Sequence, residues 1–154
     1  MIEVNEQVEV SASPRFVWNL LSDPRAVVDC VPGAALGEQK EDGSFDASIT
    51  IKFGPAKVAF HANVALELDA AAMVGNVITK GKDKQGGTRF RATMNFRVVA
   101  QDQAAGSTIP IVAEVEVGGR LASLVESGAS LVVKRMTSEF SERLAARCAE
   151  ASAA

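Results

Sequence analysis

Apolar and polar residues alternate along most of the chain up to residue 117. In residues 45–68, every second residue is apolar on both sides of Gly54-Pro55. This alternation predicts two antiparallel strands that share one apolar face and are joined by a tight turn. Glu6 is the misfit in the apolar row of the first strand. The same pattern predicts that first strand and three others, over residues 2–10, 73–82, 90–98 and 109–117.

Helical spacing replaces the alternation in two regions. Ser13-Pro14 is typical of a helix start, and the apolar residues that follow predict a short helix up to Asp23-Pro24. A second short helix is predicted from Pro24 to about Asp29. After Gly118-Gly119, apolar residues fall on one side of a long helix over residues 120–147. At ~1.5 Å per residue, this helix is roughly 40 Å long and spans the whole sheet.

A chain of 154 residues fits one domain with one core. The order of elements predicts an α+β fold, in which a curved antiparallel sheet wraps round the long C-terminal helix and two short helices follow the first strand. We expect residues 1–148 to form this single domain and residues 149–154 to form a short flexible tail.

The long helix is expected to cover the apolar sheet face incompletely. One helix is about 10 Å wide, whereas six or seven strands about 4.8 Å apart form a sheet roughly 30 Å wide. Gly128, midway along the helix, has two interpretations, which are close approach of a ligand and tight packing or a kink. The sequence therefore favours an apolar space for a lipophilic ligand between sheet and helix. Strand parity and helical spacing place these residues on its wall: Phe45, Ile49, Phe60, Val64, Phe90, Met94, Phe96, Leu124, Gly128 and Val132.

Composition narrows the choice of partners. The formal net charge is −3, so no basic face is expected to bind nucleic acid. The longest apolar runs fall far short of the roughly 20 residues of a transmembrane helix, so none is predicted. Cys30 and Cys148 are expected to be reduced thiols.

Candidate catalytic and metal-binding groups are scarce in the sequence. His61 is the only histidine, and the alternation places it on the polar face of its strand. A zinc site or a catalytic triad needs further ligands or an inward partner. The strand faces assigned to the interior carry no titratable group, which argues against acid–base catalysis. Trp18 is interpreted as a core anchor, with a pocket lid as the alternative.

The order of elements resembles the helix-grip fold of the START and birch-pollen-allergen (Bet v 1-like, SRPBCC) superfamily. Short motifs spread over nearly the whole chain look more specifically like the family of the carbon monoxide dehydrogenase protein CoxG. They are Ser13-Pro14 through Val17-Trp18, Leu21, Asp23-Pro24, Cys30-Val31-Pro32-Gly33, Gly54-Pro55-Ala56-Lys57, Lys80-Gly81-Lys82 and Val117-Gly118-Gly119-Arg120-Leu121-Ala122.

This resemblance implies a non-enzymatic accessory protein of a molybdenum hydroxylase of the carbon monoxide dehydrogenase type. Such a protein holds a quinone in its cavity and helps membrane recruitment or electron delivery, without a covalently bound cofactor or a metal. It is expected in the cytoplasm, with peripheral contact to the inner face of the cytoplasmic membrane.

Two alternatives remain open at this stage. Helix grips also include cyclases and hydrolases, because a fold does not fix a function. An enzyme of that kind requires two or more polar side chains converging in the cavity. A pure protein-docking module requires a packed core and an apolar patch on the outer surface.

Overall fold

The computed structural model describes residues 2–31, 33–53, 55–83, 87–101, 106–119 and 122–153. In chain order the elements are β1 (Ile2–Val10), α1 (Pro14–Leu21), α2 (Pro24–Cys30), β2 (Ala34–Gln39), β3 (Phe45–Phe53), β4 (Ala56–Asp69), β5 (Val74–Asp83), β6 (Thr88–Arg97), β7 (Val99–Ala100), β8 (Ser107–Gly119) and α3 (Ala122–Ala153).

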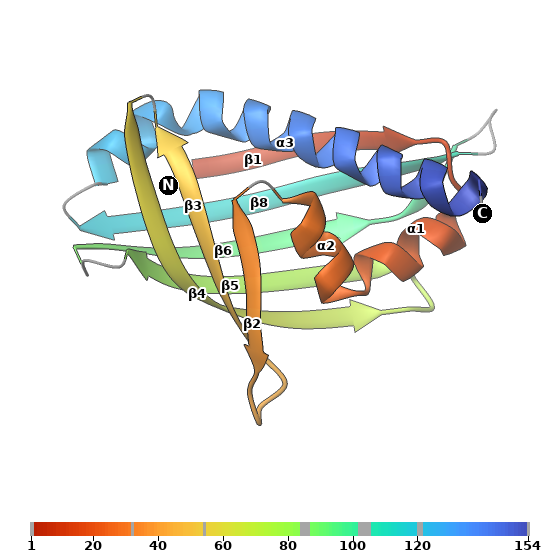
Figure 1. The fold of residues 1–154 in the computed structure, drawn as a ribbon, viewed down its shortest axis with the longest axis horizontal. Helices are drawn as coiled ribbons and strands as arrows, with labels where there is room; N and C mark the ends of the chain where they lie inside the picture. Colours follow the sequence, from red (N-terminus) through yellow and green to blue (C-terminus); the bar gives the residue numbers. More distant parts are fainter. Residues whose placement is uncertain are drawn as a thin grey trace.

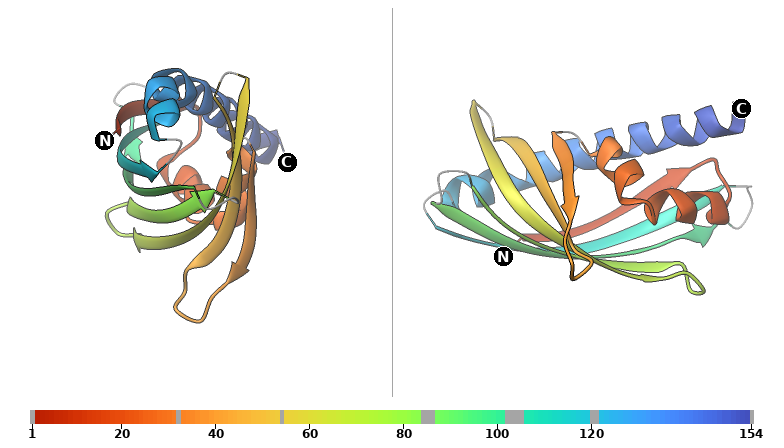
Figure 2. Two further views of the ribbon diagram at one scale, coloured as in Figure 1. Left: turned by 90° about the vertical axis from the view of Figure 1, so that its left-hand side faces the viewer. Right: turned by 60° about the horizontal axis from the view of Figure 1, so that its bottom comes forward.

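The strands form one antiparallel sheet in the order β1-β8-β6-β5-β4-β3-β2, and the short β7 pairs with β8. The sheet is strongly curved, with α3 lying along its concave side and α1 and α2 at one end (Figures 1 and 2). Phe53 pairs with Ala56, which confirms the predicted hairpin, although Gly54 lies outside the described residues. The predicted α+β architecture, with a curved sheet round a long C-terminal helix, is confirmed.

Local sequence explains where the helices begin and end. The hydroxyl of Ser13 accepts a hydrogen bond from the Phe16 amide at 3.3 Å, and the Asp23 carboxylate accepts one from the Arg25 amide at 3.1 Å. Each cap satisfies an amide that has no partner within the first turn. The long helix continues through Ala153, beyond its predicted end near Arg147. The residues that follow Arg147 include several alanines and a glutamate, which are strong helix formers.

The described core consists of two hydrophobic clusters that pack against different parts of α3. The α1 cluster contains Val8, Val10, Ala12, Val17, Trp18, Leu21, Cys30, Phe96, Val98, Ile109, Leu144 and Cys148. The β4 cluster contains Val58, Phe60 and Val132, with Ile2, Ile49, Ile51, Phe90, Val117 and Met136 packed against it. Trp18 is buried in the α1 cluster, which confirms its interpretation as a core anchor.

The two cysteines belong to the α1 cluster, where Cys30 of α2 and Cys148 of α3 are both buried free thiols. An ion pair at 3.1 Å between the neighbouring residues Asp29 and Arg147 also joins these two helices. The pair is largely exposed and adds little stability by itself. Cys30 and Cys148 thus join α2 to α3 inside the core, and Asp29 and Arg147 join the same helices at the surface.

Removal of the two thiols is expected to reduce the decrease in the free energy of unfolding at alkaline pH. Burial raises the pKa of both thiols above the ordinary value of 9.0. The folded protein thus keeps protons that the unfolded chain loses, so this stabilisation is complete below pH 9.0 and is lost as the pH rises through the folded-state values. Denaturant titrations should give a lower free energy of unfolding at about pH 10 than at about pH 8. The variant with Cys30→Ala and Cys148→Ala should show a smaller difference in the free energy of unfolding between these two pH values. An unchanged difference would show that the buried thiols do not cause it.

Candidate ligand pocket

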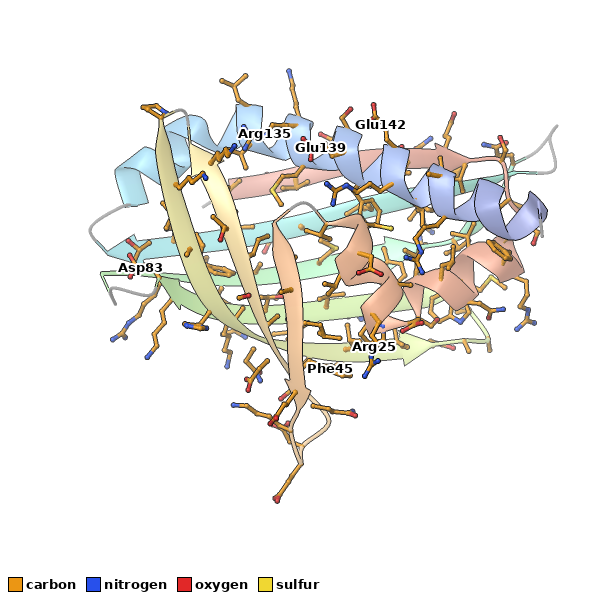
Figure 3. All side chains as sticks on the ribbon, viewed as in Figure 1. Arg25, Phe45, Asp83, Arg135, Glu139 and Glu142 are labelled. Carbon is orange, nitrogen blue, oxygen red and sulfur yellow. The ribbon has the colours of Figure 1, made fainter. Side chains whose placement is uncertain are left out.

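A pocket of about 280 Å³ lies between the sheet and α3. Its described lining comes from the α1–α2 region (Leu21, Pro24, Val27, Val28, Val31), from the sheet (Val4, Glu6, Leu36, Phe45, Ala47, Val64, Leu66, Val77, Met94, Phe96, Ile109, Ile111) and from α3 (Met136, Thr137, Phe140). Figure 3 shows Phe45 at the start of β3, next to the hairpin that joins β2 to β3. Among these residues only Glu6 and Thr137 are polar.

The pocket borders the stretch of α3 between its two fully buried contacts with the core. Val132 belongs to the β4 cluster, whereas Leu144 and Cys148 belong to the α1 cluster. The stretch of α3 between these contacts contributes the pocket residues Met136, Thr137 and Phe140. An apolar cavity of about 150 Å³ holds benzene, so this larger pocket has room for a small aromatic ligand.

Four of the residues predicted for the apolar wall line this pocket, namely Phe45, Val64, Met94 and Phe96. Met94 is 38% exposed although it belongs to the inward row of β6, because its side chain faces the open space of the pocket. Its exposure therefore reflects the pocket, since the remaining inward positions of that strand are better covered.

Four other predicted wall residues lie in the β4 cluster and are not among the lining residues: Ile49, Phe60, Phe90 and Val132. Phe60 and Phe90 pack edge to face, with their ring centroids 5.1 Å apart. Val132 and Met136 of α3 pack against this part of the sheet. Ile49, Phe60 and Phe90 lie on the predicted face of the sheet and Val132 packs against them from α3, but none of the four lines the pocket.

The last two predicted wall residues are on α3. Gly128 is half-buried and is not among the lining residues, and the side chain of Leu124 lies outside the described part of the structure. Among the α3 side chains that the structure describes, those that line the pocket begin at Met136, roughly 12 Å further along the helix at 1.5 Å per residue. Helical spacing identified the correct side of the helix but not the position along its axis.

Glu6 corrects the prediction that the interior faces of the strands carry no titratable group. Along β1, even-numbered residues are buried or half-buried and odd-numbered residues are exposed, and Glu6 belongs to the inward row between Val4 and Val8. Its appearance as a misfit in an apolar row was the sequence signal for this position. The α2 wall was also missed, because nothing in the sequence places that helix over the sheet.

The electrostatics of the pocket are simple. Glu6 is the only titratable side chain among the described lining residues. Glu142 lies on the side of α3 that faces away from the sheet (Figure 3), and Arg135 donates a hydrogen bond to the Lys52 carbonyl at 2.7 Å. His61 is exposed, as predicted. Within the described ranges, no group of three or more His, Cys, Asp or Glu side chains is placed to hold a metal ion.

Phe96 connects the pocket to the α1 cluster. Its ring lies 6.0 Å from that of Trp18, measured between centroids, and it faces Gly75 on the neighbouring strand β5. A Cβ atom at Gly75 would overlap Cε1 and Cζ of the Phe96 ring. Glycine at this position thus lets the ring lie flat on the sheet, where it forms one side of the pocket.

Gly75→Ala is expected to push the Phe96 ring off β5 and to lower the free energy of unfolding by about 1–3 kcal/mol, as overpacking does. The same displacement should change the emission of Trp18, which is the only tryptophan. Gly118→Ala is the matched control, because a Cβ atom there meets no other atom within 4 Å. Equal effects of the two substitutions would contradict this role of Gly75.

A curved antiparallel sheet closed by a long C-terminal helix over an apolar pocket defines the START and Bet v 1-like helix-grip class, and solved structures agree with this assignment. A conserved protein from Geobacillus kaustophilus superimposes with a TM-score of 0.83 at 19% identity, covering 97% of this chain and 96% of that one. The Zhui aromatase/cyclase from Streptomyces sp. R1128 gives 0.66 at 14% identity, with 96% and 93% covered. A START superfamily protein from Mycobacterium smegmatis gives 0.59 at 18% identity, with 96% and 97% covered.

The family follows from the sequence itself. The model of the family of CoxG, a subunit of carbon monoxide dehydrogenase, matches residues 7–149, and the chain belongs to this family. The resemblance inferred from the short motifs is thereby confirmed. A comparison with curated protein sequences finds no match. No helix in the described part of the chain is both long and apolar enough to cross a membrane.

Proposed function

We propose that this protein is a non-enzymatic accessory protein of a molybdenum hydroxylase of the carbon monoxide dehydrogenase type, and that it carries a quinone in its pocket. The observation that carries this proposal is the pocket of about 280 Å³, whose described lining is apolar apart from Glu6 and Thr137. Pockets of this kind bind ligands chiefly by removing apolar surface from water.

The chemistry of a prenylated quinone suits this lining. The flat ring matches a space bordered by Phe45, Phe96 and Phe140. Each methylene of an isoprenoid chain that leaves water contributes about 0.8 kcal/mol. The pocket has room for the ring and the beginning of the chain, so most of a long chain extends outside it.

Membership of the CoxG family supports the choice of partner. We place the protein in the cytoplasm, with peripheral contact to the inner face of the cytoplasmic membrane. There it helps recruit the hydroxylase or deliver its electrons to the membrane quinone pool. A carrier that withdraws a quinone from the bilayer and presents it to a soluble enzyme would combine both roles.

The two alternatives have less support. A cyclase or hydrolase requires two or more polar side chains converging in the cavity. The described lining has two, Glu6 and Thr137, and of these only Glu6 can act as an acid or a base. A pure docking module would have a packed core in place of the pocket. The presence of the pocket therefore favours the carrier.

Solvent extraction of the purified protein, followed by mass spectrometry, tests the proposal. A prenylated quinone in stoichiometric amount is the expected result. The ligand-free protein is then titrated with menadione while the emission of Trp18 is followed, because this residue packs on the pocket residue Phe96. Protein that yields no lipophile on extraction and shows no saturable quenching by menadione would overturn the proposal.

A further inference from the structure

Glu6 places a carboxylate in otherwise apolar surroundings. It lies in the inward row of β1, its register partner on β8 is the pocket residue Ile111, and its neighbour in the row, Val4, also lines the pocket. The helix α3 runs along β1 (Figure 1) and contributes Thr137 to the same lining. The carboxylate is thus held at the edge of the sheet, beneath the covering helix.

Within the described part of the chain, the Glu6 side chain makes no hydrogen bond or ion pair. An acidic group on an apolar surface costs stability unless it finds a partner. The positions on either side of it, Val4 and Val8, show that apolar residues fit this row. If β1 served only to bury apolar surface, valine at position 6 would make the protein more stable. The carboxylate therefore indicates a function toward the pocket.

We infer that Glu6 is a specificity-determining residue that accepts a hydrogen bond from a hydroxyl group of the bound lipophile. A carboxylate is an acceptor without donors, so it attracts an O–H group and repels a carbonyl oxygen. A phenolic or hydroquinone hydroxyl needs one acceptor, which Glu6 provides. An ammonium group carries three donors, and the described lining offers only Glu6 and Thr137 to receive them.

For the proposed quinone carrier, on which this step rests, the inference means that the pocket favours the hydroquinone over the quinone. The two forms have nearly the same shape and differ in whether their oxygens donate or only accept. A preference of about tenfold for the reduced form would raise the midpoint potential of the bound two-electron couple by about 30 mV. The protein would then hold the reduced ligand more tightly than the oxidised one.

Calorimetric titrations with two matched ligand pairs test the inference. The first pair is naphthol and the corresponding methoxynaphthalene, which lacks the donor. The second pair is menadiol and menadione, measured without oxygen. We expect the wild-type protein to bind the hydroxyl-bearing member of each pair about tenfold more tightly, since hydrogen bonds to charged groups are among the stronger ones.

Three variants assign the preference to Glu6. Glu6→Leu should bind both members of each pair equally, and thermal melts check that it is folded. Glu6→Gln keeps the shape of the side chain but adds an amide donor, so it should shift the preference toward menadione. Glu3→Leu, on the exposed row of the same strand, should behave as the wild type does. A purely structural role of Glu6 would not shift the preference toward menadione in Glu6→Gln.

Each outcome of the titrations is decisive. Equal affinities in the wild-type protein, or a preference that survives in Glu6→Leu, would overturn the inference. If the naphthol pair behaves as expected while neither menadione nor menadiol binds, the inference stands and the quinone part of the proposed function fails. A protein that binds none of the four probes would overturn both.

Discussion

Ala47→Phe is expected to weaken the binding of menadione at least tenfold, a loss of about 1.4 kcal/mol or more. Ala47 is a small residue on the pocket wall contributed by β3. A phenyl ring at this position would occupy space that the ligand needs. Because the ring enters an existing pocket and phenylalanine is favourable in strands, the fold should be little affected. The affinity is measured from the quenching of Trp18 emission, and the fold is checked by thermal unfolding.

Ala65→Phe is the matched control for the blocked pocket. Ala65 lies on β4 between the lining residues Val64 and Leu66, so the alternation of the strand directs it to the outer face of the sheet. The control should bind menadione as the wild-type protein does. If Ala47→Phe and Ala65→Phe bind equally well, the ligand lies elsewhere and the carrier proposal loses its site.

Leu144→Ala should produce the largest loss of stability, about 2–5 kcal/mol in the free energy of unfolding. Leu144 is only 2% exposed and packs in the α1 cluster, where it fixes the C-terminal half of α3 over α1 and β1. Truncation removes buried methyl groups and leaves a cavity in close-packed surroundings. Denaturant titration measures the change.

Leu131→Ala is the control on the same helix, because Leu131 is 77% exposed. The same chemical change at a surface position should alter the free energy of unfolding by no more than about 0.5 kcal/mol. A loss similar to that of Leu144→Ala would show that Leu131 is covered in solution, for example by a second molecule. The comparison therefore tests which side of α3 faces the sheet.

Strand parity carried much of the structural prediction. Phe45 and Ile49 both belong to the alternating apolar row predicted for their strand, and both face the concave side of the sheet. Parity depends only on the geometry of the extended backbone, which turns successive side chains to opposite faces, so it is visible in the sequence. The caps at Ser13 and Asp23 are equally local signals, and the predicted helix starts at Pro14 and Pro24 are confirmed.

The position of the pocket could not be derived in this way. Phe45 lines the pocket, whereas Ile49 packs in the β4 cluster, although the two residues share one strand and one face. The difference depends on where α3 meets the sheet, which is set by contacts between residues far apart in the chain. Gly128 was the most visible irregularity of the helix, yet the described lining residues of α3 begin about two turns later, at Met136.

Local pattern in the sequence thus determined the three helices, six of the strands in their order, the inward face of those strands and, through the family motifs, the class of protein. It did not show the strands β2 and β7. Only the tertiary structure decided that α2 forms one wall of the pocket and that Glu6 belongs to its lining. The physical reason is that alternation and helical spacing report which side of an element avoids water. They do not report whether that side meets another side chain or an open space. This depends on how closely elements far apart in the sequence pack against each other.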